Sequence, residues 1–107
     1  MEIKKRNESG YSIISLVGEV DLHFSPKARE EILKALKNNE NVLVELSEVS
    51  YIDSSGIASL VEGYQMSKKS GQTFGLLSVS NAAMQVLKLA RLDSVFPIYD
   101  NVEDVKD

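Results

Sequence analysis

The tetrapeptide Asp53–Gly56, with the sequence DSSG, sets two adjacent hydroxyl groups beside a carboxylate. Apolar residues follow it at helical spacing from Ile57 to Tyr64, so we expect a helix to start at the tetrapeptide. The first amides of a helix lack intrahelical partners and carry the positive end of the helix dipole. The hydroxyls of Ser54 and Ser55 would therefore lie where a negative charge is stabilised, which makes this a natural place for a phosphate.

Helix capping is the simpler role for the same tetrapeptide. Asp53, Ser54 and Ser55 are all residue types that commonly stand before an apolar periodic segment. Taken alone, the tetrapeptide favours this structural role. The case for a phosphate depends on the sequence around it.

A short apolar run precedes the tetrapeptide and would position it. Val42–Leu46 is nearly continuous in apolar residues, which is typical of a central strand buried on both faces of a sheet. We expect a connector containing Val49, Tyr51 and Ile52 to join this strand to the helix. The tetrapeptide would then form a strand-to-helix junction.

The rest of the chain alternates strands with helices after an initial hairpin. Four other strands are expected: one that begins at Ile3, one over Tyr11–Val17 that ends at Gly18, one over Thr73–Leu77 and one over Val95–Tyr99. Pro97 would keep the last of these at an edge of the sheet. One other expected helix runs from Ser25, which would cap it before Pro26, to about Asn39. Another is capped by Ser80-Asn81, and its buried face would comprise Ala83, Val86, Leu87 and Ala90. A final helical turn is expected over Val102–Val105. This order predicts an α/β fold, a mixed, mainly parallel sheet of four to five strands with helices packed on it.

Length and composition limit the classes of function. The 107 residues predict one domain, residues 1–107, which is too short for a substrate domain plus a cofactor domain. A net charge of −4 argues against direct binding of nucleic acid, so any effect on transcription would be indirect. The charged N-terminus and the lack of a long apolar run predict a soluble, cytoplasmic protein without membrane insertion.

Several catalytic arrangements fit poorly. His23, the only histidine, could combine with Ser54 and Asp53 as serine, base and acid, but the pattern G-x-S-x-G is missing and Asp53 directly precedes the nucleophile. Turnover of a generic ester that disappears in Ser54→Ala would revive this hydrolase hypothesis. No phosphate-binding P-loop string occurs, and one histidine without cysteine argues against a transition-metal centre. We therefore predict a binding protein without catalytic residues, cofactor or metal.

Three segments together resemble the STAS family, the anti-sigma factor antagonists. They are Gly18-Glu19-Val20-Asp21, the stretch from Leu46 through the DSSG tetrapeptide, and Lys68-Lys69-Ser70-Gly71. The most specific element is the D-S-[ST]-G signature between strand and helix, supported by G-E-x-D upstream. The resemblance covers nearly the whole chain and implies the same α/β architecture.

The resemblance implies a partner switch controlled by phosphorylation. The unphosphorylated protein would bind an anti-sigma factor that is also a serine kinase of the histidine-kinase-like ATPase type, and so release a sigma factor. The kinase would then phosphorylate the serine directly after the signature aspartate, which is Ser54, with Ser55 as the rival site. A PP2C-type phosphatase would reverse the reaction.

The same resemblance marks the surroundings of the phosphorylated serine. On sequence alone, Glu19 and Asp21 would be solvated loop acids, but STAS proteins place the acid at the position of Asp21 near the serine. The residues expected around the phosphosite and in partner binding are Asp21, His23, Asp53, Ser55 and Gly56, together with the rest of the Glu19–His23 loop and part of the second helix.

One departure concerns the partner. Many members continue with a leucine-glycine pair after the signature, whereas Ile57-Ala58-Ser59 follows here. STAS domains also serve as accessory subunits of lipid ABC transporters and as regulatory tails of anion transporters, without a serine phosphorylation cycle. A transporter subunit is therefore the alternative function; a neighbouring permease and ATPase gene would support it, and a neighbouring kinase or phosphatase gene would support the switch.

Overall fold

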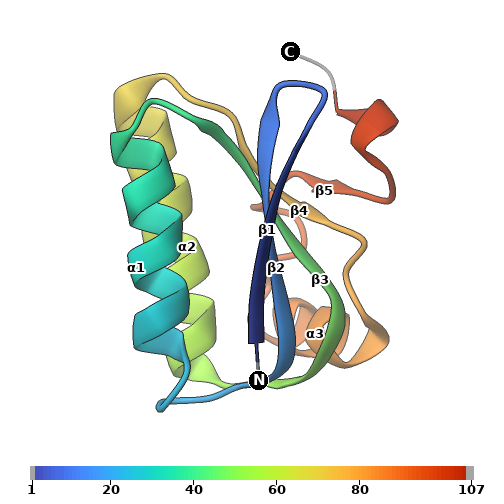
Figure 1. Ribbon diagram of the computed structural model, residues 1–107. Coiled ribbons are helices and arrows are strands. Elements are labelled where there is room, and N and C mark those ends of the chain that lie inside the picture. Colours follow the sequence, from blue (N-terminus) through green and yellow to red (C-terminus); the bar gives the residue numbers. More distant parts are fainter. Residues whose placement is uncertain (1, 106–107) are drawn as a thin grey trace.

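A five-stranded sheet with the spatial order β1-β2-β3-β4-β5 forms the centre of the computed structural model, which describes residues 2–105 (Figure 1). β1 is antiparallel to β2, and the remaining neighbours are parallel. This confirms the predicted α/β class with a mixed, mainly parallel sheet. In chain order the elements are β1 (Glu2–Glu8), β2 (Tyr11–Val20), α1 (Ser25–Lys37), β3 (Asn41–Ile52), α2 (Ser54–Ser70), β4 (Phe74–Leu77), α3 (Asn81–Leu89), β5 (Ile98–Tyr99) and the 3-10 turn η1 (Val102–Asp104).

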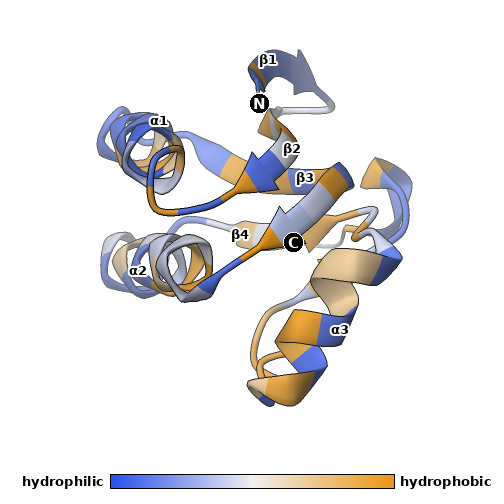
Figure 2. Cartoon of the chain, turned by 90° about the horizontal axis from the view of Figure 1, so that it is seen from below, coloured by the Kyte–Doolittle hydropathy of each residue, from blue (hydrophilic) through white to orange (hydrophobic). Residues whose placement is uncertain are grey.

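The helices α1 and α2 lie side by side along the sheet, and α3 lies apart from this pair (Figures 1 and 2). Gly63 allows α2 to come close to its neighbours, because a Cβ there would lie 2.8 Å from Ile32 Cγ2 of α1 and 2.9 Å from Phe74 Cε2 of β4. α2 ends at Gly71, whose φ of 72° is the left-handed conformation that favours glycine.

The central strand β3 is buried on both faces, as its apolar run predicts. Val42, Val44 and Leu46 belong to the main core with α1 and α2, whereas Leu43 points to a second, smaller cluster. Successive side chains of a strand alternate between faces, so a continuous apolar run fills both. The second cluster comprises Tyr11, Ile13, Leu43, Leu77 and Val102, the last contributed by η1.

Two strands are longer than expected, and both extensions lead to the candidate site. β3 continues to Ile52, so the stretch expected as a connector is strand. β2 continues through Gly18 to Val20, because Glu19 and Val20 pair with Tyr51 and Ile52 of β3. Gly18 has a φ of 97° beside a shift in register, a conformation that glycine adopts without steric cost.

Three local expectations were wrong. Ser25 does not cap α1: it lies inside the helix, and Phe24 holds the cap position without a side-chain hydrogen bond. Of the expected strand from Val95, only Ile98–Tyr99 pairs with the sheet, because the amides of Val95 and Phe96 donate to the carbonyl of Leu92 and form a turn. This short strand lies at an edge of the sheet, as expected. Ala90 is exposed and follows α3 as its C-terminal cap, so it is not part of the buried stripe.

No helix within residues 2–105 has both the length and the apolar composition needed to cross a membrane.

Candidate functional site

The carboxyl ends of β2 and β3 bring two loops to the same end of the molecule. Val20 and Ile52 are paired in the parallel ladder, and the amide of Asp53 donates to the carbonyl of Val20 at 3.2 Å. The turn that begins at Asp21 therefore lies beside the start of α2. This is the edge of a parallel sheet at which ligands and partners commonly bind.

Asp53 caps α2. Its Oδ1 accepts hydrogen bonds from the amides of Ser55, at 2.9 Å, and Gly56, at 3.2 Å. The same oxygen accepts the hydroxyl of Ser55 at 2.5 Å. The hydrogen bond from the Ser55 hydroxyl has the largest effect on the pKa of Asp53 and lowers it. The bonds from the backbone of Gly56, Ser55 and Leu22 lower this pKa further, whereas desolvation opposes them. The capping role considered for the tetrapeptide is thus filled by Asp53.

Ser55 is held on both sides of its hydroxyl. Besides donating to Asp53, Ser55 Oγ accepts a hydrogen bond from Ser25 Oγ of α1 at 2.9 Å. Ser55 is half-buried and Ser25 is buried. Sequence reasoning missed Ser25 as part of the site, since a serine before proline carries only the signal of a helix start.

Ser54 differs from Ser55 in its exposure and in the hydrogen bonding of its hydroxyl. It is the first residue of α2 and is exposed. Within residues 2–105 its hydroxyl has no hydrogen-bond partner. Of the two adjacent serines, Ser54 alone therefore presents an unengaged hydroxyl at the helix N-terminus.

Asp21 orders the turn before α1. Its Oδ1 accepts hydrogen bonds from the amides of His23, at 3.0 Å, and Phe24, at 3.1 Å, and its carbonyl oxygen accepts from Phe24 and Ser25. Asp21 and His23 lie in the turn after β2, and the tetrapeptide follows β3, so the two loops are neighbours at the carboxyl ends of these paired strands. His23 is exposed, and in the described part of the chain its imidazole forms no hydrogen bond with Ser54 or Asp53, so the serine, base and acid of the hydrolase hypothesis are not assembled.

Gly56 lets α2 start directly against the strand ends. A Cβ at this position would lie 2.7 Å from Ile52 Cγ1 and 2.9 Å from Val20 Cγ1. Both contacts are shorter than real Cβ contacts, so a larger residue would push the helix start away from the sheet. Gly56 therefore sets the position of the two serines through packing.

Two exposed large apolar side chains belong to the segments that lead into this site, one in the turn before α1 and one near the end of β3. Leu22, next to Asp21, is 69% exposed, and Tyr51, opposite Glu19 in the sheet, is 51% exposed. Sequence reasoning included Leu22 only as part of the Glu19–His23 loop and assigned no binding role to Tyr51, because an apolar residue in a pattern is first assigned to the core.

Comparisons with known proteins relate this chain to one family. A family model described as STAS domain matches residues 2–105. The anti-sigma F factor antagonist of Paenibacillus polymyxa is 26% identical over 103 residues, which cover 94% of this chain and 88% of that protein. The anti-sigma-B factor antagonist of Bacillus subtilis (strain 168) is 27% identical over 94 residues, which cover 88% of this chain and 85% of that protein.

A solved structure shares the fold over nearly the whole chain. The crystal structure of an anti-sigma factor antagonist from Mycobacterium paratuberculosis superposes with a TM-score of 0.86 at 25% sequence identity. The superposition covers 96% of this chain and 88% of that one. With the family match spanning residues 2–105, the chain belongs to the STAS domain family.

Proposed function

We propose that this protein is an anti-sigma factor antagonist that acts as a partner switch, with Ser54 as its phosphorylation site. One observation carries the choice of site: the Ser54 hydroxyl is exposed and unengaged at the start of α2, whereas the Ser55 hydroxyl is bonded to both Asp53 and Ser25. The relatives named as antagonists of anti-sigma factors support the general role. The unphosphorylated form binds an anti-sigma factor and releases a sigma factor.

The proposed partner is also the kinase. A serine kinase that carries ATP transfers the γ-phosphate to Ser54: the hydroxyl proton passes to a base of the kinase, Oγ bonds to the γ-phosphorus, and the bond from phosphorus to the β–γ bridging oxygen breaks, releasing ADP. A PP2C-type phosphatase hydrolyses the ester with water and restores the serine. In this cycle the protein is the substrate and the binding partner, and residues 1–107 act as one domain.

Phosphorylation affects folding and binding differently. The phosphate adds about 1.5 to 2 negative charges. At the start of a helix this charge is favoured by roughly 0.3 to 1 kcal/mol, so α2 remains intact. In an interface the same charge must be desolvated beside Asp53, and about 1.4 kcal/mol of such cost weakens binding tenfold. We therefore expect phosphorylation to release the partner without unfolding the protein.

The proposed partner surface surrounds Ser54. It comprises the turn with Asp21 and His23, the first turn of α2 with Asp53, Ser55 and Gly56, and the exposed side chains of Leu22 and Tyr51. Apolar contacts from Leu22 and Tyr51 would supply affinity, and the acids would set the sensitivity to added charge.

The test is intact-mass spectrometry with fragment mapping on protein from its native host, before and after incubation with host lysate and ATP. We expect one phosphate on Ser54 that is absent from Ser54→Ala and retained in Ser70→Ala, an exposed serine at the other end of α2. Absence of phosphate from Ser54 and Ser55 under all growth conditions would contradict the switch and favour the transporter-subunit alternative. A phosphate on Ser55 alone would contradict the choice of site.

A further inference from the structure

The hydroxyls of Ser25 and Ser55 and the carboxylate of Asp53 form a hydrogen-bonded chain that joins α1 to the start of α2. Ser25 Oγ lies 2.9 Å from Ser55 Oγ, which lies 2.5 Å from Asp53 Oδ1. We propose that Ser25 is a positioning residue for the phosphorylation site, which holds the Ser55 hydroxyl on Asp53 and thereby restricts phosphorylation to Ser54. The proposal rests on the proposed function for its biological consequence, and on the structure alone for the positioning role.

The direction of the chain follows from its last member. An ionised carboxylate only accepts hydrogen bonds, so the single hydroxyl proton of Ser55 must be donated to Asp53. Ser55 then faces Ser25 only with a lone pair, so Ser25 must be the donor in that contact. Donation by Ser25 polarises the Ser55 hydroxyl and strengthens its bond to the carboxylate.

This arrangement makes Ser55 a poor acceptor of a phosphoryl group. A serine attacks phosphorus with a lone pair that must point at the phosphoryl group, but one lone pair of the Ser55 hydroxyl is bound to the proton of Ser25, and the bond to Asp53 fixes the orientation of that hydroxyl. Ser25 is only 4% exposed, so it also closes the side of Ser55 that faces α1. A phosphate on Ser55 would place new negative charge against the carboxylate of Asp53.

The chain depends on the packing of α1 against α2. Ser59, one turn further along α2, donates to the carbonyl oxygens of Ser55, at 3.1 Å, and Ser25, at 3.4 Å. Ser59 is 6% exposed and joins the same two helices, but it does not touch the hydroxyl of Ser55. Ser59→Ala is therefore a matched control that removes a buried hydroxyl from the same contact and leaves the chain intact.

The experiment compares the wild-type protein, Ser25→Ala and Ser59→Ala in two measurements. The first is the titration of the Asp53 carboxyl carbon by NMR on the purified proteins, which requires no kinase. We expect Ser25→Ala to raise the pKa of Asp53, because the bond from Ser55 weakens, and Ser59→Ala to leave it unchanged.

The second measurement is phosphosite mapping after incubation of the three proteins with native-host lysate and ATP. Loss of one hydrogen bond raises the fraction of molecules in which the Ser55 hydroxyl is free of Asp53 by roughly 2- to 10-fold. We expect the amount of phosphate on Ser55 to rise by the same factor in Ser25→Ala and to stay unchanged in Ser59→Ala.

The two measurements separate the possible failures. An unchanged pKa of Asp53 in Ser25→Ala would overturn the positioning role, whatever the kinase does. A raised pKa with phosphate still confined to Ser54 would overturn the restriction of the phosphorylation site. If no variant takes up phosphate, the proposed function fails, and the titration still decides whether Ser25 positions Ser55.

Discussion

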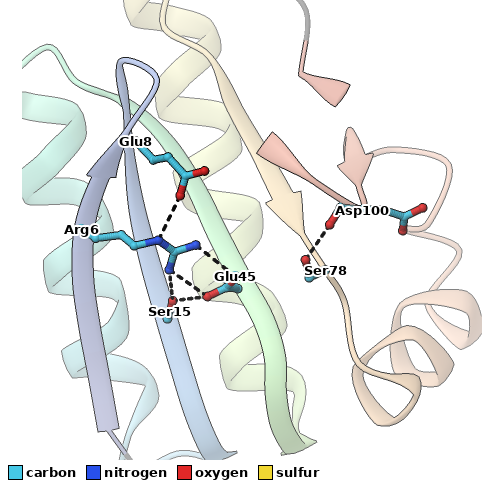
Figure 3. A network of polar contacts seen from close by, with 6 residues as sticks. All are labelled: Arg6, Glu8, Ser15, Glu45, Ser78 and Asp100. Atoms are coloured by element: carbon cyan, nitrogen blue, oxygen red, sulfur yellow. Dashed lines mark hydrogen bonds and ion pairs between the residues drawn. The ribbon is translucent and has the colours of Figure 1, made fainter. Parts of the chain in front are cut away.

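Arg6 of β1 reaches across β2 to form a two-point ion pair with Glu45 of β3 (Figure 3). The Nη1–Oε1 and Nη2–Oε2 distances are 3.1 Å and 3.3 Å. Ser15 of β2 lies between them, accepting from Arg6 Nη1 at 3.3 Å and donating to Glu45 Oε1 at 2.5 Å. Because Glu45 stands between two core residues of β3, Val44 and Leu46, this network occupies the face of the sheet opposite α1 and α2. It ties the edge strand to the centre of the sheet.

The Arg6–Glu45 pair should make stability depend on pH. The hydrogen bond from Arg6, and that from Ser15, lower the pKa of Glu45 below its ordinary 4.5 although desolvation opposes them. A carboxyl with a lowered folded-state pKa stabilises the protein fully above its ordinary pKa, and this contribution is lost as the pH falls through the folded-state value. We expect Glu45→Gln to reduce the free energy of unfolding by about 1 kcal/mol at neutral pH, less than a fully buried pair because Arg6 is partly exposed.

Urea denaturation at pH 7 and at pH 3 measures this difference. The difference in the free energy of unfolding between wild type and Glu45→Gln should be smaller at pH 3, which lies below the ordinary pKa of Glu45, because the contribution of the lowered pKa is lost progressively as the pH falls below 4.5. Glu48→Gln, at an exposed position on the same strand, serves as the control and should change stability little at either pH. A gap of the same size at both pH values would show that the ion pair is not its source.

The two adjacent serines should differ in their effect on stability. Ser55→Ala removes one bond to Asp53 and one from Ser25, and we expect it to lower the free energy of unfolding by about 1 to 2 kcal/mol. Ser54→Ala removes an exposed hydroxyl without a partner in the described residues, and we expect a change within about 0.5 kcal/mol. Thermal or urea unfolding of both variants tests this, and equal losses would refute the assignment of the two environments.

Gly56→Ala should destabilise the start of α2. The added Cβ would lie within 3 Å of side-chain atoms of Ile52 and Val20, so the helix start must shift or the core must rearrange. Such overpacking costs about 1 to 3 kcal/mol, which outweighs the better helix propensity of alanine. Urea denaturation measures the loss, with the exposed Ser54→Ala as the control for a substitution in the same turn. A Gly56→Ala protein as stable as wild type would contradict this prediction, because it would mean that Ile52 and Val20 move aside without a measurable cost.

Replacements of Asp53 should separate its charge from its capping bonds. Asparagine also caps helices well, whereas alanine removes the acceptor for the amides of Ser55 and Gly56. We therefore expect the melting temperature to fall more for Asp53→Ala than for Asp53→Asn at pH 7. The pKa of Asp53 is lowered by these bonds, so its contribution should be full above its ordinary 3.8 and fade as the pH falls further. Equal melting temperatures for the two variants at neutral pH would contradict a capping role.

Features that repeat at short spacing could be predicted from the sequence. The start of α2 at the tetrapeptide and the burial of Val42–Leu46 on both faces follow from local residue types. Strand ends were less predictable. Glu19 and Tyr51 are polar or exposed and carry no strand pattern, yet they pair because β2 and β3 run on together beyond their apolar parts.

The sequence by itself determined the α/β class, the strand-to-helix junction and the serine pair at the start of α2, since each depends on neighbouring residues and their spacing. Only the tertiary structure showed that the hydroxyl of Ser55 is bonded to a second helix, whereas that of Ser54 has no hydrogen-bond partner within residues 2–105. That distinction rests on Ser25, which lies 30 residues before Ser55 and reaches it only because α1 packs against α2. A hydrogen bond between distant segments forms when the packing of the helices brings donor and acceptor within about 3 Å, and no local pattern in the chain records that distance.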